Sequence, residues 1–209
     1  DKYKDIKGLK AIYDWGNPSQ PGISDIDLVF VFDSGVEEMP MLTRSFNFLD
    51  SDSRYLVRHP FVFIDEKTFS DVKYIYPKTN FNLIYGDSVK IKSLSKENQV
   101  KCNVALMNDL IIRHYPRDFL YQKVKKKINV RDTLLRLNSL KYTVKILNEF
   151  GLKNNEWDHK IKLISKLREG WFADKDYELL VHLNSKIVYD IMDMIESYNS
   201  FLRKSYVNV

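Results

Sequence analysis

The first part of the chain, residues 1–92, consists of short apolar and aromatic runs that Pro, Gly, Asn and Asp separate. Runs of this length between turn-forming residues are typical of β-strands. The pattern predicts strands at 9–15, 27–32, 61–65 and 72–76. It also predicts a short extended or helical piece at 81–85, and it is compatible with a helix across the sheet at 41–49.

Beyond residue 92, apolar side chains recur at intervals of three and four, which is the spacing of a helix that buries one face. Ser93 or Ser95 is placed to cap a first helix, and Pro116 is expected to interrupt it. Further helices are predicted at 134–150, ended by Gly151, at 157–170, ended near Gly170, and at 177–201.

These elements predict an α+β fold with two domains. A small mixed β-sheet domain, residues 1–92, precedes a helical bundle, residues 93–209, whose short loops favour antiparallel packing. The boundary follows Gly86 and a Lys- and Ser-rich stretch. Because the join offers no long flexible linker, the two domains are expected to share an interface.

Composition narrows the class of protein further. The one cysteine, Cys102, cannot form an internal disulfide or a cysteine-based zinc site, and this favours the cytoplasm. The longest apolar run, Leu28–Phe32, is too short to cross a bilayer, so no membrane association is expected. The net charge of +5 mildly favours an anionic partner. Its densest run, at Lys123 and 125–127, is either a solvated helix end or a phosphate contact.

The segment 15–28 carries the candidate chemistry. Asp25 and Asp27 are two residues apart and directly precede the apolar run that begins at Leu28. In an extended chain such residues point to the same face, so the two carboxylates project together. Neighbouring carboxylates repel unless a cation lies between them, and Mg²⁺ favours one or two carboxylates together with substrate phosphates. The pattern predicts a Mg²⁺ site at these aspartates, the alternative being a plain turn.

The loop before the two aspartates is rich in small residues. Such residues allow backbone N–H groups to approach a phosphate closely, which makes the loop a candidate nucleotide-binding segment. Pro18 and Pro21 stiffen it and remove two N–H donors. The candidate nucleotide-binding residues are Gly16, Asn17, Ser19 and Ser24.

Gly16-Asn17, followed by Ser24-Asp25-Ile26-Asp27-Leu28, resembles the signature of the DNA polymerase beta-like nucleotidyltransferase superfamily, especially its stand-alone, aminoglycoside-nucleotidyltransferase-like members. The segment 82–87 is similar to the Leu-Tyr-Gly-Asp/Glu segment that often closes their catalytic domain. The resemblance implies Mg²⁺-dependent transfer of a nucleoside monophosphate from an NTP, with ATP expected, to an acceptor hydroxyl. Because no broad basic stripe is visible, a small-molecule or protein acceptor is favoured over nucleic acid. Asn17 departs from the usual Ser or Gly, and the loop 18–24 is shorter than usual.

The resemblance also implies a third acidic residue on a later strand. Asp65 is the candidate, as base or third ligand, with Asp71 behind it, although Asp65-Glu66-Lys67 fits a plain turn equally well. An alternative is therefore a catalytically silent module on the same fold that binds a nucleotide or a protein partner, as in a toxin–antitoxin-like pair. A further possibility is RNA binding through the lysine-rich run at 123–127.

Overall fold

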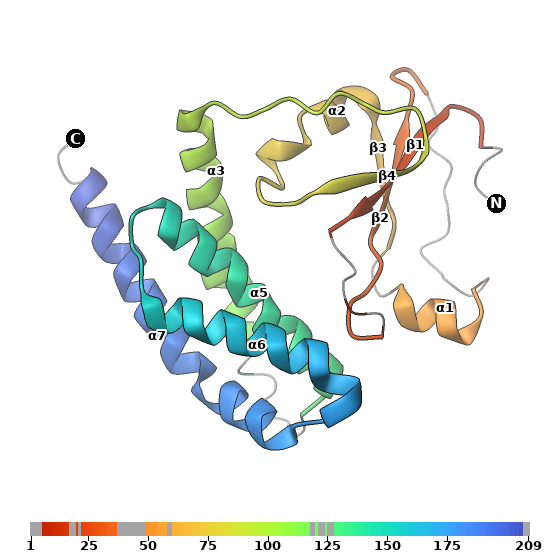
Figure 1. Ribbon diagram of the computed structural model, residues 1–209. Helices are drawn as coiled ribbons and strands as arrows, with labels where there is room; N and C mark the ends of the chain where they lie inside the picture. The colour runs from red at the N-terminus through yellow and green to blue at the C-terminus, as the bar shows by residue number, and fades with distance from the viewer. Residues whose placement is uncertain are drawn as a thin grey trace. The chain divides into compact units, whose positions relative to one another are not determined.

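The protein is described by a computed structural model that covers residues 6–16, 20, 22–36, 49–57, 60–117, 120, 124 and 128–206. It has an α+β fold, in which a mixed four-stranded sheet comes first and helices follow (Figure 1). The chain divides into two compact units, Asp1–Cys102 and Asn103–Val209. The division lies inside helix α3 (Lys96–Asp109) rather than at residue 92.

The sheet of the first unit has the strand order β3-β2-β1-β4. Strand β1 pairs antiparallel with both β2 and β4, whereas β2 and β3 run parallel. The first three predicted strands are confirmed to within one residue at each end, and the piece expected at 81–85 is a strand. The strands are β1 (Leu9–Trp15), β2 (Leu28–Phe32), β3 (Val62–Asp65) and β4 (Phe81–Gly86).

Both faces of the sheet are covered by apolar side chains. Val29 and Val31 of β2 lie on one face, in a cluster with Phe69 of helix α2 (Glu66–Ser70). Phe30 and Phe32 lie in a second cluster on the other face. This alternation follows from the two-residue period of a strand, and burial on both sides explains why β2 is a continuous apolar run.

The prediction of a strand at 72–76 is wrong, because this segment forms a 3₁₀ turn, η1 (Val72–Tyr74). Val72 and Tyr76 both pack into the cluster around Val29, whereas Tyr74 between them is exposed. Two inward side chains four residues apart have helical spacing, and a strand would have turned Tyr74 inward as well. The helix expected at 41–49 lies outside the described residues except for Leu49. The next described helix is α1 (Ser51–Leu56).

The first predicted helix begins as expected but does not stop at Pro116. Helix α3 (Lys96–Asp109) is capped by Ser95, whose hydroxyl accepts the Asn98 N–H at 3.2 Å. A π-helical turn, η2 (Leu110–His114), follows, and helical residues continue to Arg117. Proline lacks an N–H and its ring crowds the carbonyl four residues earlier, so the wider π turn lets the helix pass through Pro116.

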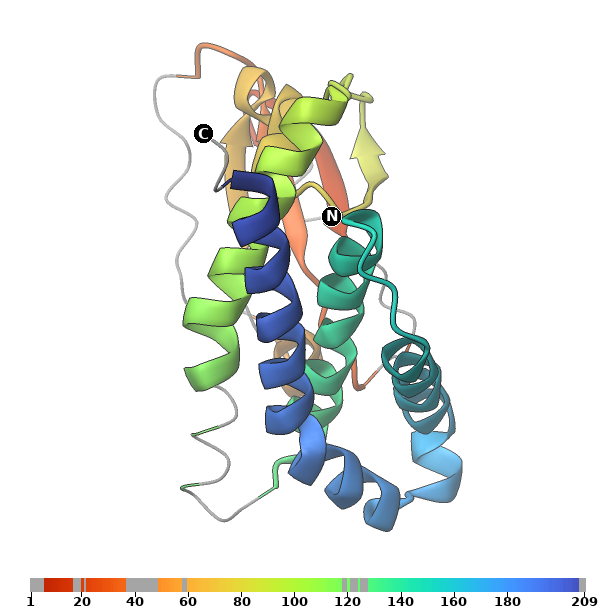
Figure 2. The same ribbon diagram turned by 90° about the vertical axis from the view of Figure 1, so that its left-hand side faces the viewer.

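Three long helices make up most of the second unit. They are α5 (Val130–Glu149), α6 (Asn155–Asp174) and α7 (Tyr177–Tyr206). Helices α5 and α7 pack along each other (Figure 2). Gly151 follows the end of α5 as predicted, but α6 continues past Gly170 because Trp171 is buried and packs edge-on against Tyr177, with ring centroids 5.1 Å apart. Within the described part of the chain, no helix has the length and apolar character needed to span a bilayer.

Side-chain hydrogen bonds show that neighbouring helices of the second unit run antiparallel. Asn103 donates to Glu149 at 2.9 Å, and the hydroxyls of Tyr115 and Thr143 share a hydrogen bond of 2.6 Å. Contacts near the start of the helical segment 96–117 are thus made with the end of α5, and contacts near its end with the middle of α5, so the two helices are antiparallel. Helices α6 and α7 are also antiparallel. There, Trp157 donates to Asp193 and Lys160 donates to Asp190.

Candidate functional site

One end of the sheet brings Gly16 close to the segment that holds the two aspartates. Strand β1 ends at Trp15, and its backbone N–H donates to the carbonyl oxygen of Asp27 at 2.9 Å. Gly16 therefore lies beside the start of β2. Strand β4 begins at the same end, where the Gly16 N–H donates to the carbonyl oxygen of Asn80 at 3.0 Å. The antiparallel strands thus place Trp15 beside Asp27 and the next residue, Gly16, beside Asn80.

Asp25 and Asp27 are both partly exposed, and the segment that holds them is fixed at two points. The Ile26 N–H donates to the carbonyl oxygen of Leu56, at the end of α1, at 2.9 Å. Burial, and then the negative charge of Asp27, raise the pKa of the Tyr76 phenol above its ordinary value. Because Tyr76 packs on Trp15 with ring centroids 4.1 Å apart, Asp27 lies on this aromatic face of the sheet.

The candidate phosphate loop is only partly described. Gly16 has a φ of 122°, and a Cβ placed there would meet no atom within 4 Å, so space is open beside its backbone. Its N–H, however, already bonds to Asn80. Ser24 is buried, and its N–H donates to the carbonyl oxygen of Gln20 at 2.8 Å. Asn17 and Ser19 lie outside the described residues, so their role in binding a nucleotide stays a prediction.

The structure corrects the expectation that Asp65 completes the site. Strands β2 and β3 are parallel, and Asp65 pairs with Phe32 at the far end of β2. Asp27 is five residues away from Phe32, which corresponds to about 16 Å along an extended strand. Asp65 instead begins α2, where its carboxylate accepts the Thr68 N–H at 2.9 Å and the Thr68 hydroxyl at 2.6 Å. Asp71, the reserve candidate, pairs with Lys92 at 2.9 Å.

This capping role predicts a stability effect that depends on pH. The hydroxyl and N–H of Thr68 lower the pKa of the Asp65 carboxyl. Asp65→Ala should lower the free energy of unfolding by about 1 kcal/mol at pH 7. The deficit should persist above the ordinary carboxyl pKa of about 3.9 and disappear as the pH falls through the lower native value, because the wild-type carboxylate is then protonated. Urea unfolding of both proteins across this range measures it, and a deficit that grew in acid would contradict the cap.

The carboxylates that remain fit a Mg²⁺ ion that arrives with a nucleotide. Mg²⁺ is often held by one or two carboxylates, with water and phosphate oxygens filling the other positions. Asp25 and Asp27 are partly exposed carboxylates of this chemical kind, and their binding of Mg²⁺ stays a prediction. Across the described residues, no three His, Cys, Asp or Glu side chains are grouped to hold a metal by themselves. A Mg²⁺ ion held by these two carboxylates would therefore need further oxygen ligands from water or a bound nucleotide.

The same end of the sheet contains polar residues that were not predicted. The amide nitrogen of Asn82 lies 3.4 Å from both the Asp14 carboxylate and the carbonyl oxygen of Gly16. Asn80 and Tyr76 complete the group. They come together through the pairing of β4 with β1, which the sequence did not predict because 81–85 fitted a helix as well as a strand.

Comparison of the chain with protein-family models, with curated proteins and with solved structures found no match.

Proposed function

We propose that this protein is a Mg²⁺-dependent nucleotidyltransferase. It would move a nucleoside monophosphate from an NTP, with ATP the expected donor, to a hydroxyl of a small-molecule or protein acceptor. The observation that carries the proposal is the antiparallel pairing of β1 and β2, which sets Gly16 beside the segment Asp25–Asp27. The resemblance of this segment to the nucleotidyltransferase signature supports it.

The proposed reaction forms one bond and breaks another at the α-phosphorus. The acceptor oxygen bonds to that phosphorus, the bond to the oxygen bridging to the β-phosphate breaks, and pyrophosphate leaves with the electron pair. The hydroxyl proton passes to solvent. A Mg²⁺ ion bound with the nucleotide would supply charge neutralisation on the phosphates. The carboxylates of Asp25 and Asp27 would hold that ion, and the space beside Gly16 would admit the triphosphate.

The position of Asp65 favours a second candidate, a module that binds a nucleotide without turning it over. The carboxylate expected to act as base is at the other end of β2 and is already bonded to Thr68. The hydrogen bond between the Gly16 N–H and Asn80 also removes one donor from phosphate binding. Both candidates require the same nucleotide site, and they differ in whether pyrophosphate is released.

A thermal unfolding experiment on the full chain tests the shared site. A ligand that binds only the native state at 100 times its dissociation constant adds about 2.7 kcal/mol of stability. Mg²⁺ with ATP should therefore raise the melting temperature by several degrees, and EDTA should remove the effect. Mg²⁺ alone is the control.

Pyrophosphate release in the presence of a hydroxyl acceptor would support the transferase, and stabilisation without release would support the silent module. If none of the four common NTPs stabilises the protein with Mg²⁺, neither candidate stands.

A further inference from the structure

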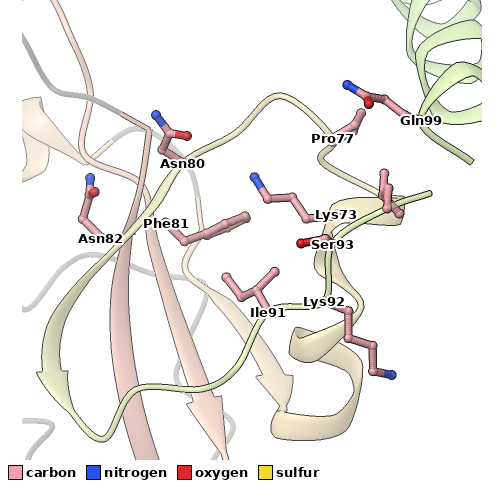
Figure 3. Close-up of a pocket in the computed structure, with 10 residues that line it drawn as sticks. Lys73, Pro77, Asn80, Phe81, Asn82, Ile91, Lys92, Ser93 and Gln99 are labelled. Atoms are coloured by element: carbon pink, nitrogen blue, oxygen red, sulfur yellow. The ribbon is translucent and has the colours of Figure 1, made fainter. Parts of the chain in front are cut away.

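A pocket of about 550 Å³ lies along the outer edge of β4, inside the first unit (Figure 3). Drug-sized and cofactor pockets are typically 300–1,000 Å³. Two of its lining residues, Asn80 and Asn82, are the same asparagines that contact Gly16. Gly16 therefore lies next to two residues that line the pocket.

The pocket and the aspartates are aligned across the sheet. Trp15 of β1 pairs with Phe81 of β4, and on its other side its N–H bonds to Asp27. Neighbouring strands are about 4.8 Å apart, so the backbones of Asp27 and Phe81 are separated by about 10 Å. Trp15 and Phe81 belong to the same face, with ring centroids 6.3 Å apart. The ribose and phosphates of one nucleotide can bridge such a separation.

The residues of the pocket suit a flat ligand with a polar edge. Phe81 and Ile91 provide an apolar surface next to Lys73, whose ammonium lies 5.8 Å from the centre of the Phe81 ring (Figure 3). The carboxamide of Asn80 can both donate and accept hydrogen bonds, whereas that of Asn82 lies on the opposite face of β4, beside Asp14. Asparagine pairs with the edges of nucleobases, and aromatic side chains stack on their faces.

We propose that this pocket binds the base of the NTP. The base would lie against Phe81, with its edge hydrogen-bonded by Asn80, while its phosphates extend past Gly16 toward Asp25 and Asp27. This inference rests on the proposed function, because it assumes that the phosphates bind at the two aspartates. The rival occupant is the acceptor substrate, which would use the same pocket without affecting the affinity for the donor.

Calorimetric titration of the full chain with two probes separates these cases. The probes are ATP and inorganic triphosphate, each with Mg²⁺. The variant Asn80→Ala/Phe81→Leu removes one amide and the flat ring while keeping an apolar side chain against the core. It should weaken ATP binding about ten-fold and leave triphosphate binding within about two-fold, since stacking acts on the base alone. Leu83→Ala, an exposed position on the same strand, is the matched control and should change neither affinity.

Each other result has a distinct meaning. An equal loss of affinity for ATP and triphosphate would show that the pocket serves the phosphates or the fold, and would overturn the inference while the proposed function stands. Unchanged affinity for both would also overturn it and would leave the pocket to the acceptor. If the wild-type protein binds neither probe, the proposed function fails and the inference fails with it.

Discussion

Asparagine at both position 25 and position 27 is expected to abolish the Mg²⁺-dependent stabilisation by ATP. If the protein is catalytically active, the rate of pyrophosphate release should fall by about 100-fold or more. That is the usual effect of removing a group that stabilises charge developing in the transition state. Asparagine keeps the size and shape of the side chain but loses the negative charge that Mg²⁺ requires. The melting temperature of the double variant, measured with ATP in Mg²⁺ and in EDTA, should be the same in both.

Asp65→Asn is the matched control for this experiment. It also neutralises a carboxylate, but asparagine is as good a helix cap as aspartate, so α2 should remain intact. Its response to Mg²⁺ and ATP should equal that of the wild type. A double variant at positions 25 and 27 that kept the full response would place the nucleotide elsewhere. Loss of the response in Asp65→Asn would contradict its assignment as a helix cap alone.

Gly86→Ala should lower the free energy of unfolding by about 2–5 kcal/mol. Gly86 has a φ of 82°, and a Cβ there would lie 2.0 Å from the carbonyl oxygen of Lys10. The left-handed conformation alone costs an L-residue about 1–2 kcal/mol. Relief of the overlap adds about 1–3 kcal/mol, because the backbone of β1 must move. Denaturant unfolding followed by far-UV circular dichroism measures the change.

Gly35→Ala separates the two contributions. Gly35 also has a positive φ, 112°, but a Cβ there would meet no atom within 4 Å. This variant should lose only the conformational part, about 1–2 kcal/mol. If the two variants lost the same free energy, close approach between β4 and β1 would not be the reason for glycine at position 86.

The elements that the sequence predicted correctly are those in which local pattern and burial agree. The run Leu28–Phe32 is apolar at every position because both faces of β2 are covered. The stripe of α7 is confirmed at Leu180, Ile187, Ile191 and Met194, which are all buried. In these segments a single period accounts for the contacts, and no distant residue is needed to choose between a helix and a strand.

The remaining features depend on contacts that a local pattern does not contain. The residues around Val72 and Tyr76 favour a strand, but these two side chains both pack against the sheet, and only a helical turn lets residues four apart do so while Tyr74 faces outward. The placement of Asp65 depends on whether β3 runs parallel or antiparallel to β2. The sequence of residues 61–65 is compatible with either direction. Antiparallel pairing would have moved the end of β3 to the other end of β2, where the two aspartates lie. The local pattern therefore placed Asp27 at the start of β2 but could not place Asp65, and the binding of Mg²⁺ by Asp25 and Asp27 stays a prediction.

The direct passage from β3 into α2 has a consequence for redesign. No residue separates the strand from the helix, so Asp65 both ends β3 and caps α2, and its carboxylate is used in that cap. If the register of Val29 with Val62 is continued backward by two residues, Pro60 stands level with Asp27. Pro60 is exposed, so a third acidic side chain could be introduced there, near Asp27, while Asp65 continues to cap α2.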